Sequence, residues 1–309
     1  MPAGDISLGL VGVGNWGRKI ANTVAAMPGI RLAAAASRNL DVASLLPADC
    51  RIHSDWRELV AADDLQGIII ATPSQLHGEM LVAAVEAGKA VLVEKPLVAS
   101  RGQGDWLRSR MGTQAATILV DHIHLFHPAF RALQREAARL GSLRKVQSAA
   151  GKLDDSCRGL DLLWDWAPHD LSMCLALAPG AVRVAGARWL DEGRASLDFN
   201  LSLAGGATAH VELSVARPRH RWFAAMYDGG TLVYRDGEVA SVVRMKPGDD
   251  IHAAGEPIPF EPVFPLPVAI SSFADSIRRQ DTARNSFDLG LSVVDMSADI
   301  EDSLSQIGH

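Results

Sequence analysis

Up to about residue 120, short apolar runs alternate with longer stretches of mixed polarity. The apolar runs, which we predict to be buried strands, are Ile6–Val11, Arg31–Ala36, Gly67–Ala71, Ala90–Val93 and Ala116–Val120. The stretches with helical spacing of apolar residues are Trp16–Met27, Trp56–Ala62 and Gly78–Ala87. Near-continuous apolar strands separated by helices are typical of a parallel sheet covered on both faces. We therefore predict a doubly wound α/β domain over residues 1–121.

Beyond residue 121, strands are indicated by alternation of apolar and polar residues and by short apolar runs. These stretches are Ala195–Leu203, Thr208–Val215, Trp222–Tyr227, Thr231–Arg235 and Val239–Met245. Asp-Gly turns join the last three, which predicts an antiparallel sheet with one face in water. Ser156–Leu177 and Val268–Arg279 are expected to be helical, and the proline-rich Pro257–Pro267 to be an extended connector. The second domain is then residues 122–309, with the boundary near residues 121–128.

Composition narrows the class of protein. The chain has 309 residues, 48% of them hydrophobic and 21% charged, as in globular proteins with a substantial core. A net charge of −6 gives no general attraction to nucleic acid or anionic lipid, so we expect neither partner. The apolar runs fall far short of the roughly 20 residues of a membrane helix, and residues 1–5 lack a signal-peptide pattern. Cys50, Cys157 and Cys174 form no CxxC motif, so we expect a reducing cytoplasm and no cysteine zinc site.

Gly12, Gly14 and Gly17 form a GxGxxG motif between the first predicted strand and the first predicted helix, with Asn15 and Trp16 inside it. The first glycine would allow a tight turn, the second would let the backbone approach a pyrophosphate, and the third would let helix and strand pack closely. The helix N-terminus adds amide donors and a positive dipole. The motif predicts a dinucleotide cofactor, and a purely structural turn is the alternative.

The end of the second predicted strand bears on which dinucleotide binds. An NAD enzyme usually has Asp or Glu there, which holds the ribose 2′-hydroxyl. This chain has Ser37 and Arg38 instead, and arginine pairs well with a 2′-phosphate. We therefore favour NADP over NAD, although Asp41 is close enough in sequence to keep NAD open.

Three further motifs are Ala71-Thr-Pro-Ser-Gln-Leu-His77, Glu94-Lys-Pro96 and Trp164-Asp-Trp-Ala-Pro-His-Asp170. Together with the glycine turn they resemble the Gfo/Idh/MocA oxidoreductases, the glucose–fructose oxidoreductase and inositol dehydrogenase family. The resemblance covers nearly the whole chain and is closest, around residues 120–132 and 161–177, to members related to sugar-nucleotide dehydrogenases. It implies a Rossmann domain, then an α/β domain with a large, mostly antiparallel open sheet, and a last helix able to pack back on the first domain.

The resemblance also implies a reaction and a site. The reaction is hydride transfer between NAD(P) and a secondary alcohol or ketone of a sugar, polyol or sugar derivative. Lys95 is implied as the catalytic or substrate-orienting lysine, and Pro96 as fixing the turn through a cis peptide bond. The residues implied at the cofactor cleft are Thr72, Pro73, His77, Glu94, Lys95 and Pro96. A homo-oligomer, dimer or tetramer, is implied through the second domain's sheet.

The family's second catalytic element is an Asp followed four residues later by His, here Asp165 and His169, one turn apart on one face of a helix. Oxidation of an alcohol needs a base for the hydroxyl proton, and the pKa of histidine suits this. We expect His169 to be the acid/base, Asp165 to orient it or bind a substrate hydroxyl, and Lys95 to be its partner. Lys95 acts as a base only if desolvation or a positive nicotinamide favours its neutral form; otherwise it donates a hydrogen bond. An ordinary helix pair and a surface lysine are the alternatives.

His122, His124 and His127 lie at the expected boundary, two of them on one face of an expected strand. The spacing can bind zinc, but no carboxylate or cysteine pattern completes a site and the implied chemistry needs no metal, so we expect none. His122 and His124 are candidates for lining the substrate cleft, and packing or solvated positions are the alternative. The basic run Arg217–Arg221 is expected on a solvated face or subunit contact, or near the substrate if that carries phosphate.

Two rival functions stay open at this point. A regulator that senses NAD(P) without chemistry has no need of an acid/base set, so Lys95, Asp165 and His169 favour an enzyme. The other rival is a hydrolase or lyase that uses NAD only transiently. Net consumption of NADPH would distinguish a dehydrogenase or reductase from such an enzyme. Polar candidates around the reacting carbon outnumber apolar ones, which favours a small-molecule substrate with several hydroxyls.

Overall fold

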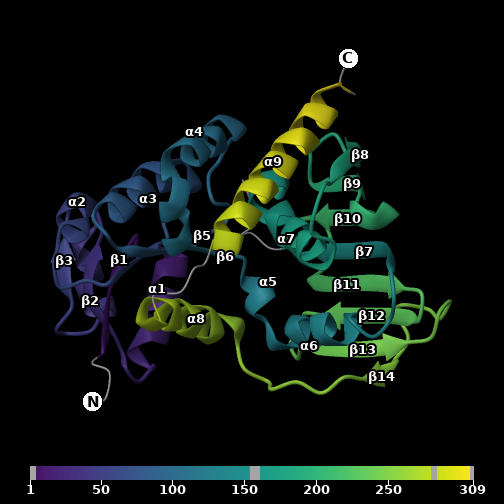
Figure 1. The fold of residues 1–309 in the computed structure, drawn as a ribbon, viewed down its shortest axis with the longest axis horizontal. Helices are drawn as coiled ribbons and strands as arrows, with labels where there is room; N and C mark the ends of the chain where they lie inside the picture. The colour runs from purple at the N-terminus through teal and green to yellow at the C-terminus, as the bar shows by residue number, and fades with distance from the viewer. Residues whose placement is uncertain (1–4, 154–160, 280–283, 307–309) are drawn as a thin grey trace. The chain divides into compact units, whose positions relative to one another are not determined.

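The computed structural model describes residues 5–153, 161–279 and 284–306. Contacts divide the chain into two compact units. The first unit is assigned Met1–His122 and Leu266–Val294, and the second Ile123–Pro265 and Asp295–His309. Each unit has its own β-sheet (Figure 1).

The sheet of the first unit has six parallel strands in the order β3-β2-β1-β4-β5-β6. The strands are β1 (Ile6–Val11), β2 (Ile30–Ala36), β3 (Arg51–His53), β4 (Gly67–Ile70), β5 (Ala90–Glu94) and β6 (Ile118–Asp121). The helices are α1 (Asn15–Ala25), α2 (Trp56–Val60), α3 (His77–Glu86), α4 (Arg101–Met111), α8 (Pro265–Arg279) and residues 284–294 of α9 (Arg284–Gln306). The strand order reverses beside β1, and such a switch point is where open α/β sheets bind their ligands.

Apolar side chains cover this sheet, as the near-continuous apolar runs predict. All six residues of β1 and all four of β4 are buried. Gly67 lets α8 pack closely on the sheet, because a Cβ at this position would stand only 2.8 Å from Phe273 and from Ile277. The helix that completes this core thus comes from near the end of the chain.

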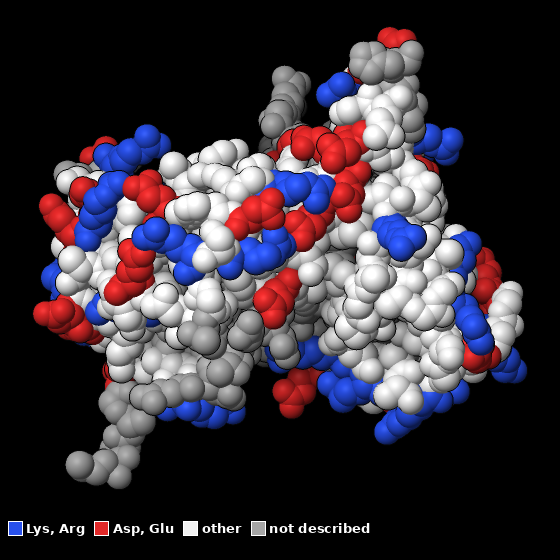
Figure 2. All heavy atoms as spheres, turned by 45° about the horizontal axis from the view of Figure 1, so that its top comes forward, with Lys and Arg blue, Asp and Glu red and all other residues white. Residues whose placement is uncertain are grey.

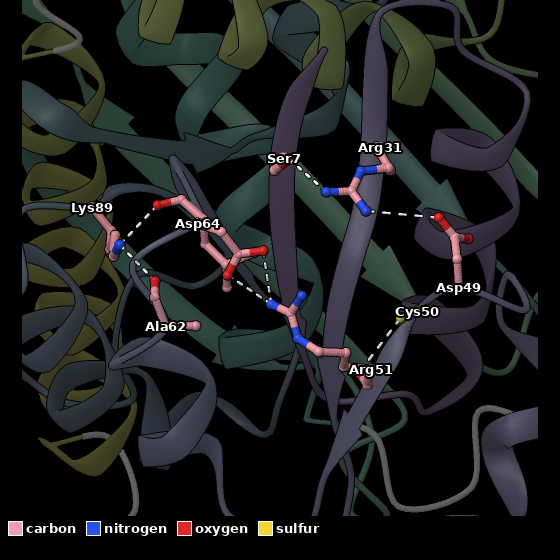
Figure 3. Close-up of polar contacts among 9 residues, drawn as sticks. Ser7, Arg31, Asp49, Cys50, Arg51, Ala62, Asp64 and Lys89 are labelled. Atoms are coloured by element: carbon pink, nitrogen blue, oxygen red, sulfur yellow. Dashed lines mark hydrogen bonds and ion pairs between the residues drawn. The ribbon is translucent and has the colours of Figure 1, made fainter. Parts of the chain in front are cut away.

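Polar contacts secure the amino ends of the strands (Figure 3). The buried Lys89 donates hydrogen bonds from Nζ to the carbonyl oxygens of Ala62 and Leu65, both at 2.8 Å. Arg51 forms an ion pair with Asp64 at 2.7 Å. These residues precede or begin β3, β4 and β5, so the carboxyl ends of the strands stay available for a site.

The sheet of the second unit has eight strands in the order β14-β13-β12-β11-β7-β10-β9-β8. The strands are β7 (Leu143–Gly151), β8 (Arg183–Trp189), β9 (Ser196–Ser202), β10 (Thr208–Ser214), β11 (His220–Tyr227), β12 (Gly230–Arg235), β13 (Ser241–Met245) and β14 (Glu256–Pro257). β7 and β10 pair in parallel, and the other pairs described are antiparallel. The prediction of a large, mostly antiparallel sheet after a doubly wound parallel one is therefore confirmed.

Besides residues 295–306 of α9, three of the described helices belong to the second unit. They are α5 (Ile123–Phe126), α6 (Pro128–Ala137) and α7 (Ala167–Leu177). The buried Phe130 of α6 packs edge-on against Phe223 of β11 and Tyr234 of β12, with ring centroids 5.8 and 6.1 Å apart. Such aromatic contacts fix α6 on the sheet.

Several elements differ from the sequence-based prediction. The pattern did not predict β3, which has only three residues, or α4, which is rich in charged residues and glycine. Pro265 to Pro267 begin α8 instead of continuing an extended connector, because the first turn of a helix does not need their missing N–H groups. Of the helix expected from residue 156 to 177, residues 156–160 lie outside the described part of the chain.

Charged side chains of both signs are interspersed over the face drawn in Figure 2. Many surface arginines in the first unit are paired, for example Arg110 with Glu86 at 2.7 Å. Among the described helices, none is both long and apolar enough to cross a lipid bilayer.

Candidate functional site

Two glycines of the turn after β1 cannot carry a side chain. Gly12 has φ +96°, and a Cβ there would stand 2.5 Å from the carbonyl oxygen of Ala71. A Cβ on Gly17 would stand 2.0 Å from the carbonyl oxygen of Gly12. The turn therefore holds β1, α1 and the chain after β4 at distances that only glycine permits.

Gly14 has a different environment. A Cβ there would meet nothing within 4 Å, and Gly14 and Asn15 are exposed. Gly14 is also the N-cap of α1, and no side chain caps that helix end. Open space beside the amides of a helix N-terminus fits the pyrophosphate of a dinucleotide.

A cavity of about 520 Å³ opens at the carboxyl ends of β1, β2 and β4, a size that suits a small-molecule ligand. The predicted cofactor residues that line it are Gly12, Gly14, Ser37, Arg38, Thr72 and Pro73. The other lining residues are Val11, Val13, Arg18, Ala36, Asn39, Val42, Ser54, Trp56, Arg57, Ala71, Leu76, Glu79 and Met80. The glycine turn and the end of β2 thus face one cavity, as binding of one dinucleotide requires.

The end of β2 presents a cation to this cavity. The Ser37 hydroxyl oxygen accepts a hydrogen bond from the Asn39 amide at 3.2 Å, and the Asn39 side chain accepts one from the Asp41 amide at 2.9 Å. This local turn leaves Arg38 exposed and among the lining residues, which do not include Asp41. Asp41, the carboxylate that could have favoured NAD, therefore does not line the cavity.

Arg57 also lines the cavity, although no sequence motif points to it. Its guanidinium lies over the Trp56 ring, 4.4 Å from the ring centroid, and pairs with Glu79 and, at 3.6 Å, with Asp55. Arg57 reaches this place because α2 follows β3, whose carboxyl end lies at the same edge of the sheet. In the sequence, only β3 could have indicated this position of Arg57, and its three residues are too few to show the pattern of a strand.

Seven of the residues predicted at the cofactor site do not line this cavity: Asn15, Trp16, Gly17, Glu94, Lys95, Pro96 and His77. For His77, the position of the side chain shows why. It is 1% exposed, with Nδ1 3.0 Å from the Pro96 carbonyl oxygen and Nε2 2.8 Å from that of Thr72. Burial lowers the pKa of His77, and a neutral imidazole has one N–H to donate to either carbonyl. The side chain points inward, between the loops after β4 and β5.

The Glu94-Lys95-Pro96 motif stands at the carboxyl end of β5. The Lys95–Pro96 peptide bond is cis, as predicted. The indole Nε1 of Trp16 donates a hydrogen bond to the Glu94 carboxylate, so the glycine turn and the motif are directly linked. Glu94 lies beside Asp121 of β6 in the strand register.

Asp121 was not predicted as a site residue. Its side chain is 1% exposed, and burial raises its pKa to about 7, against the lowering effects of a hydrogen bond with Glu94 and the charge of Lys95. Burial and then the Asp121 charge raise the pKa of Glu94 well above its usual value. Two neighbouring carboxyls in such a place titrate as one unit.

His122 follows directly and is also 1% exposed. Burial and the Lys95 charge lower its pKa to about 3, so the ring is neutral near neutral pH. In the described structure, neither of its ring nitrogens has a hydrogen-bond partner. Its role as a substrate-lining residue stays a prediction.

Asp165 and His169 do not lie on successive turns of one α-helix, as their spacing had predicted. Leu162–Trp166 form a π-helical turn, and α7 begins at Ala167. Pro168 has no N–H to donate to the carbonyl of Trp164, which breaks the regular α-helical ladder there. Asp161 caps the turn by accepting hydrogen bonds from the amides of Leu163 and Trp164, at 2.9 and 3.2 Å. π-turns are frequent at functional sites.

His169 is half-buried within a cluster of rings in the second unit. His124 packs edge-on against His169, with centroids 5.0 Å apart and planes at 90°. The Nδ1 of His124 lies 3.1 Å from the Tyr234 hydroxyl, and His127 lies 5.2 Å from the Tyr234 ring. The structure thus brings together two of the histidines singled out in the sequence, His124 and His169.

The segment with His124 is not the strand assumed for the zinc alternative. Ile123–Phe126 form the short helix α5, and the Nδ1 of His127 accepts a hydrogen bond from the Ala129 amide at the start of α6. In the described ranges, no three His, Cys, Asp or Glu side chains are grouped to hold a metal ion.

Asp170 and part of the basic run are used inside the second unit. Asp170 is fully buried, accepts a hydrogen bond from the Ser148 hydroxyl at 2.5 Å and pairs with Arg221 at 2.9 Å. Arg217 pairs with Glu212. These contacts fix α7 on the sheet and leave Asp170 a packing role.

Comparisons with known proteins place the chain among oxidoreductases. Residues 6–122 match the model of an oxidoreductase family with an NAD-binding Rossmann fold, GFO_IDH_MocA. A crystal structure described as an oxidoreductase from Magnetospirillum magnetotacticum MS-1 is 32% identical, with a TM-score of 0.84 over 96% of this chain and 99% of that one.

Two characterised relatives are dehydrogenases. The 4-carboxy-2-hydroxymuconate-6-semialdehyde dehydrogenase of Sphingobium sp. is 28% identical over 251 residues, 74% of this chain and 78% of that protein. The UDP-N-acetylglucosamine 3-dehydrogenase of Acidithiobacillus ferrooxidans is 26% identical over 221 residues, 69% of each chain. The turn and cavity at β1, β2 and β4 fit the dinucleotide that such enzymes use. This protein is an NAD(P)-dependent enzyme and belongs to the Gfo/Idh/MocA oxidoreductase family.

Proposed function

We propose that the protein is an NADP(H)-dependent dehydrogenase or reductase of a secondary alcohol or ketone in a sugar, polyol or sugar derivative. The observation that carries the proposal is the place of Lys95. It follows β5 at the carboxyl edge of the sheet, where the cofactor cavity opens beside β1, β2 and β4. A bound nicotinamide supplies or takes up the hydride in such a reaction.

The chain's own residues move and hold the proton. His169 takes the hydroxyl proton when the alcohol is oxidised and returns it when the ketone is reduced. Lys95 donates a hydrogen bond to the reacting oxygen, and Asp165 orients His169 or binds a substrate hydroxyl. The ring cluster of His169, His124 and Tyr234 supports this assignment, because it fixes the imidazole plane.

Arg38→Ala is expected to raise the Kd for NADPH by about 10- to 100-fold, since a hydrogen bond to a charged group contributes about 1.5–3 kcal/mol. The Kd for NADH should change by less than about twofold, because NADH has no 2′-phosphate. Fluorescence titration measures both constants. Arg51→Ala is the matched control, because Arg51 pairs with Asp64 and does not line the cavity. Equal affinity of the unmodified protein for the two cofactors would refute the preference.

The substrate class is tested with a panel in which NADP(H) absorbance is followed. UDP-N-acetylglucosamine, myo-inositol and D-xylose represent alcohols, keto-sugars represent the reverse direction, and cyclohexanone represents apolar ketones. We expect turnover with a hydroxylated compound and little with cyclohexanone, because unpaired polar groups in a site cost about 1–3 kcal/mol each. Turnover of the apolar ketone alone would overturn the substrate class. Conversion of a sugar without net consumption of cofactor would point to a hydrolase or lyase.

We also propose that copies of the chain associate as a dimer or tetramer through the open sheet of the second unit. A cytoplasmic location is proposed as well, and the buried free thiols of Cys50 and Cys174 are compatible with it.

A further inference from the structure

Two acidic side chains lie side by side at the carboxyl edge of the first unit's sheet, and the proposed reaction uses neither as acid or base. Glu94 ends β5 and Asp121 ends β6, and the two are direct partners in the parallel register. Lys95, to which we assign the hydrogen bond to the reacting oxygen, is the next residue after Glu94.

The surroundings of Asp121 favour a protonated carboxyl group. Asp121 is 1% exposed, and in the described part of the chain no donor group binds either of its buried carboxyl oxygens. Its neighbour in the strand register is Glu94, whose carboxyl group acts on the pKa of Asp121 and itself accepts a hydrogen bond from Trp16. A carboxylate cannot donate, so two such groups bond to each other only when one of them carries a proton.

The charged and titratable groups that act on the pair are few. Lys95 lowers the pKa of both carboxyls, so its positive charge acts on each of them. His122, which follows β6, is neutral near neutral pH, and Trp16 from α1 contributes an uncharged N–H. Electrostatic attraction is mutual, so a negative charge on the pair also stabilises the ammonium form of Lys95.

We propose that Glu94 and Asp121 share one proton, and that the single negative charge of the pair keeps Lys95 an ammonium group that donates a hydrogen bond and does not act as the base. Asp121 is thus a positioning residue, acting through Lys95. In the oxidation direction the hydride goes to the nicotinamide, the hydroxyl proton goes to His169, and Lys95 keeps its own proton. The inference rests on the role proposed above for Lys95.

The shared proton is tested first by the pH dependence of the melting temperature of the cofactor-free protein. A carboxyl whose pKa is raised on folding contributes stability at low pH that is lost as the pH rises through the folded value. The Tm of the unmodified protein relative to Asp121→Asn should therefore fall from about pH 4 to at least about pH 7. Asp64→Asn is the matched control, because Arg51 lowers the pKa of that exposed carboxyl, and its difference should stay flat over this range. A flat difference for Asp121→Asn as well would overturn the shared proton.

The effect on Lys95 is tested by NMR titration of 13C-dimethylated lysines, with the Lys95 signal assigned by its loss in Lys95→Arg. In Asp121→Asn the pair keeps one negative charge, so the pH at which Lys95 loses its proton should shift by less than about half a unit. In Glu94→Gln/Asp121→Asn the charge is gone, and this pH should fall by at least about one unit. If the pH at which Lys95 loses its proton is unchanged in the double variant, the pair has only a structural role and the inference is refuted.

One measurement needs no variant at all. The infrared spectrum of the unmodified protein should show a protonated-carboxyl band that weakens as the pH rises through about 7 and persists above it, because the pair keeps its shared proton. No such band would contradict the shared proton even if the variants failed to fold. These three measurements use neither cofactor nor substrate. A negative result in them would therefore not refute the proposed hydride transfer, and absence of hydride transfer would not change their results.

Discussion

Lys95→Met and His169→Asn should each lower kcat by at least about 100-fold, the usual contribution of a positioned acid, base or hydrogen-bond donor. Methionine keeps the length of the lysine side chain without its charge or its donors. Asparagine keeps part of the shape of histidine but takes up no proton at neutral pH. The Kd for NADPH should change by less than about threefold, because neither residue is assigned to the pyrophosphate or the 2′-phosphate.

Matched controls separate these losses from general damage. Lys145→Met removes an exposed lysine of β7, and His210→Asn removes a histidine that pairs with Asp198 at 2.8 Å, away from the ring cluster. Both controls should keep kcat within about twofold. Steady-state kinetics on the substrate found in the panel gives the values. Near-normal turnover in both site variants would show that the chemistry lies elsewhere.

Gly14→Ala should weaken NADPH binding by at least about tenfold while changing Tm by less than about 2 °C. Its backbone, with φ −76° and ψ −164°, suits any residue, and its Cβ would enter open space where the pyrophosphate is expected. Gly17→Ala should instead lower Tm by more than about 10 °C, because its Cβ would stand 2.0 Å from the Gly12 carbonyl oxygen. Titration and thermal unfolding separate the two effects. Full NADPH affinity in folded Gly14→Ala would place the cofactor away from this turn.

The local motifs could be predicted because their parts are adjacent in sequence. The glycine turn, Ser37-Arg38 and Glu94-Lys95-Pro96 each lie within a few residues at the end of an apolar run, and the structure places each at the end of its strand. The fold class followed for a similar reason, since helical and period-two patterns change near residue 121.

The parts that could not be predicted depend on contacts between distant segments. Asp121 meets Glu94 only because β5 and β6 are neighbours in register, and a sequence without strand order does not show this. Arg57 reaches the cavity from beyond β3, a strand too short for its period to be read. His77 belongs to a cofactor motif, but its side chain points inward to two carbonyl oxygens. One of them is that of Pro96 in the loop after β5, whose position the local sequence does not show.

The prediction that Asp165 and His169 share one face of an α-helix was wrong for a local reason. An interval of four residues indicates one helix face only if the backbone is α-helical throughout. Pro168 and the cap at Asp161 favour a π-turn before α7, so the two residues lie in different kinds of helix. The proline was visible in the sequence, and it was the signal that could have warned of this break.

Hydride transfer to carbon is tested most directly with NADPH that carries deuterium at both C4 positions. The protein is incubated with this cofactor and the keto form of the best substrate in the panel, and the alcohol product is analysed by mass spectrometry. Direct transfer predicts one deuterium on the former carbonyl carbon for each NADPH oxidised, and loss of this transfer in Lys95→Met. Product without deuterium, or a converted substrate with no NADPH oxidised, would contradict a role as an NADP(H)-dependent oxidoreductase of sugar-like substrates.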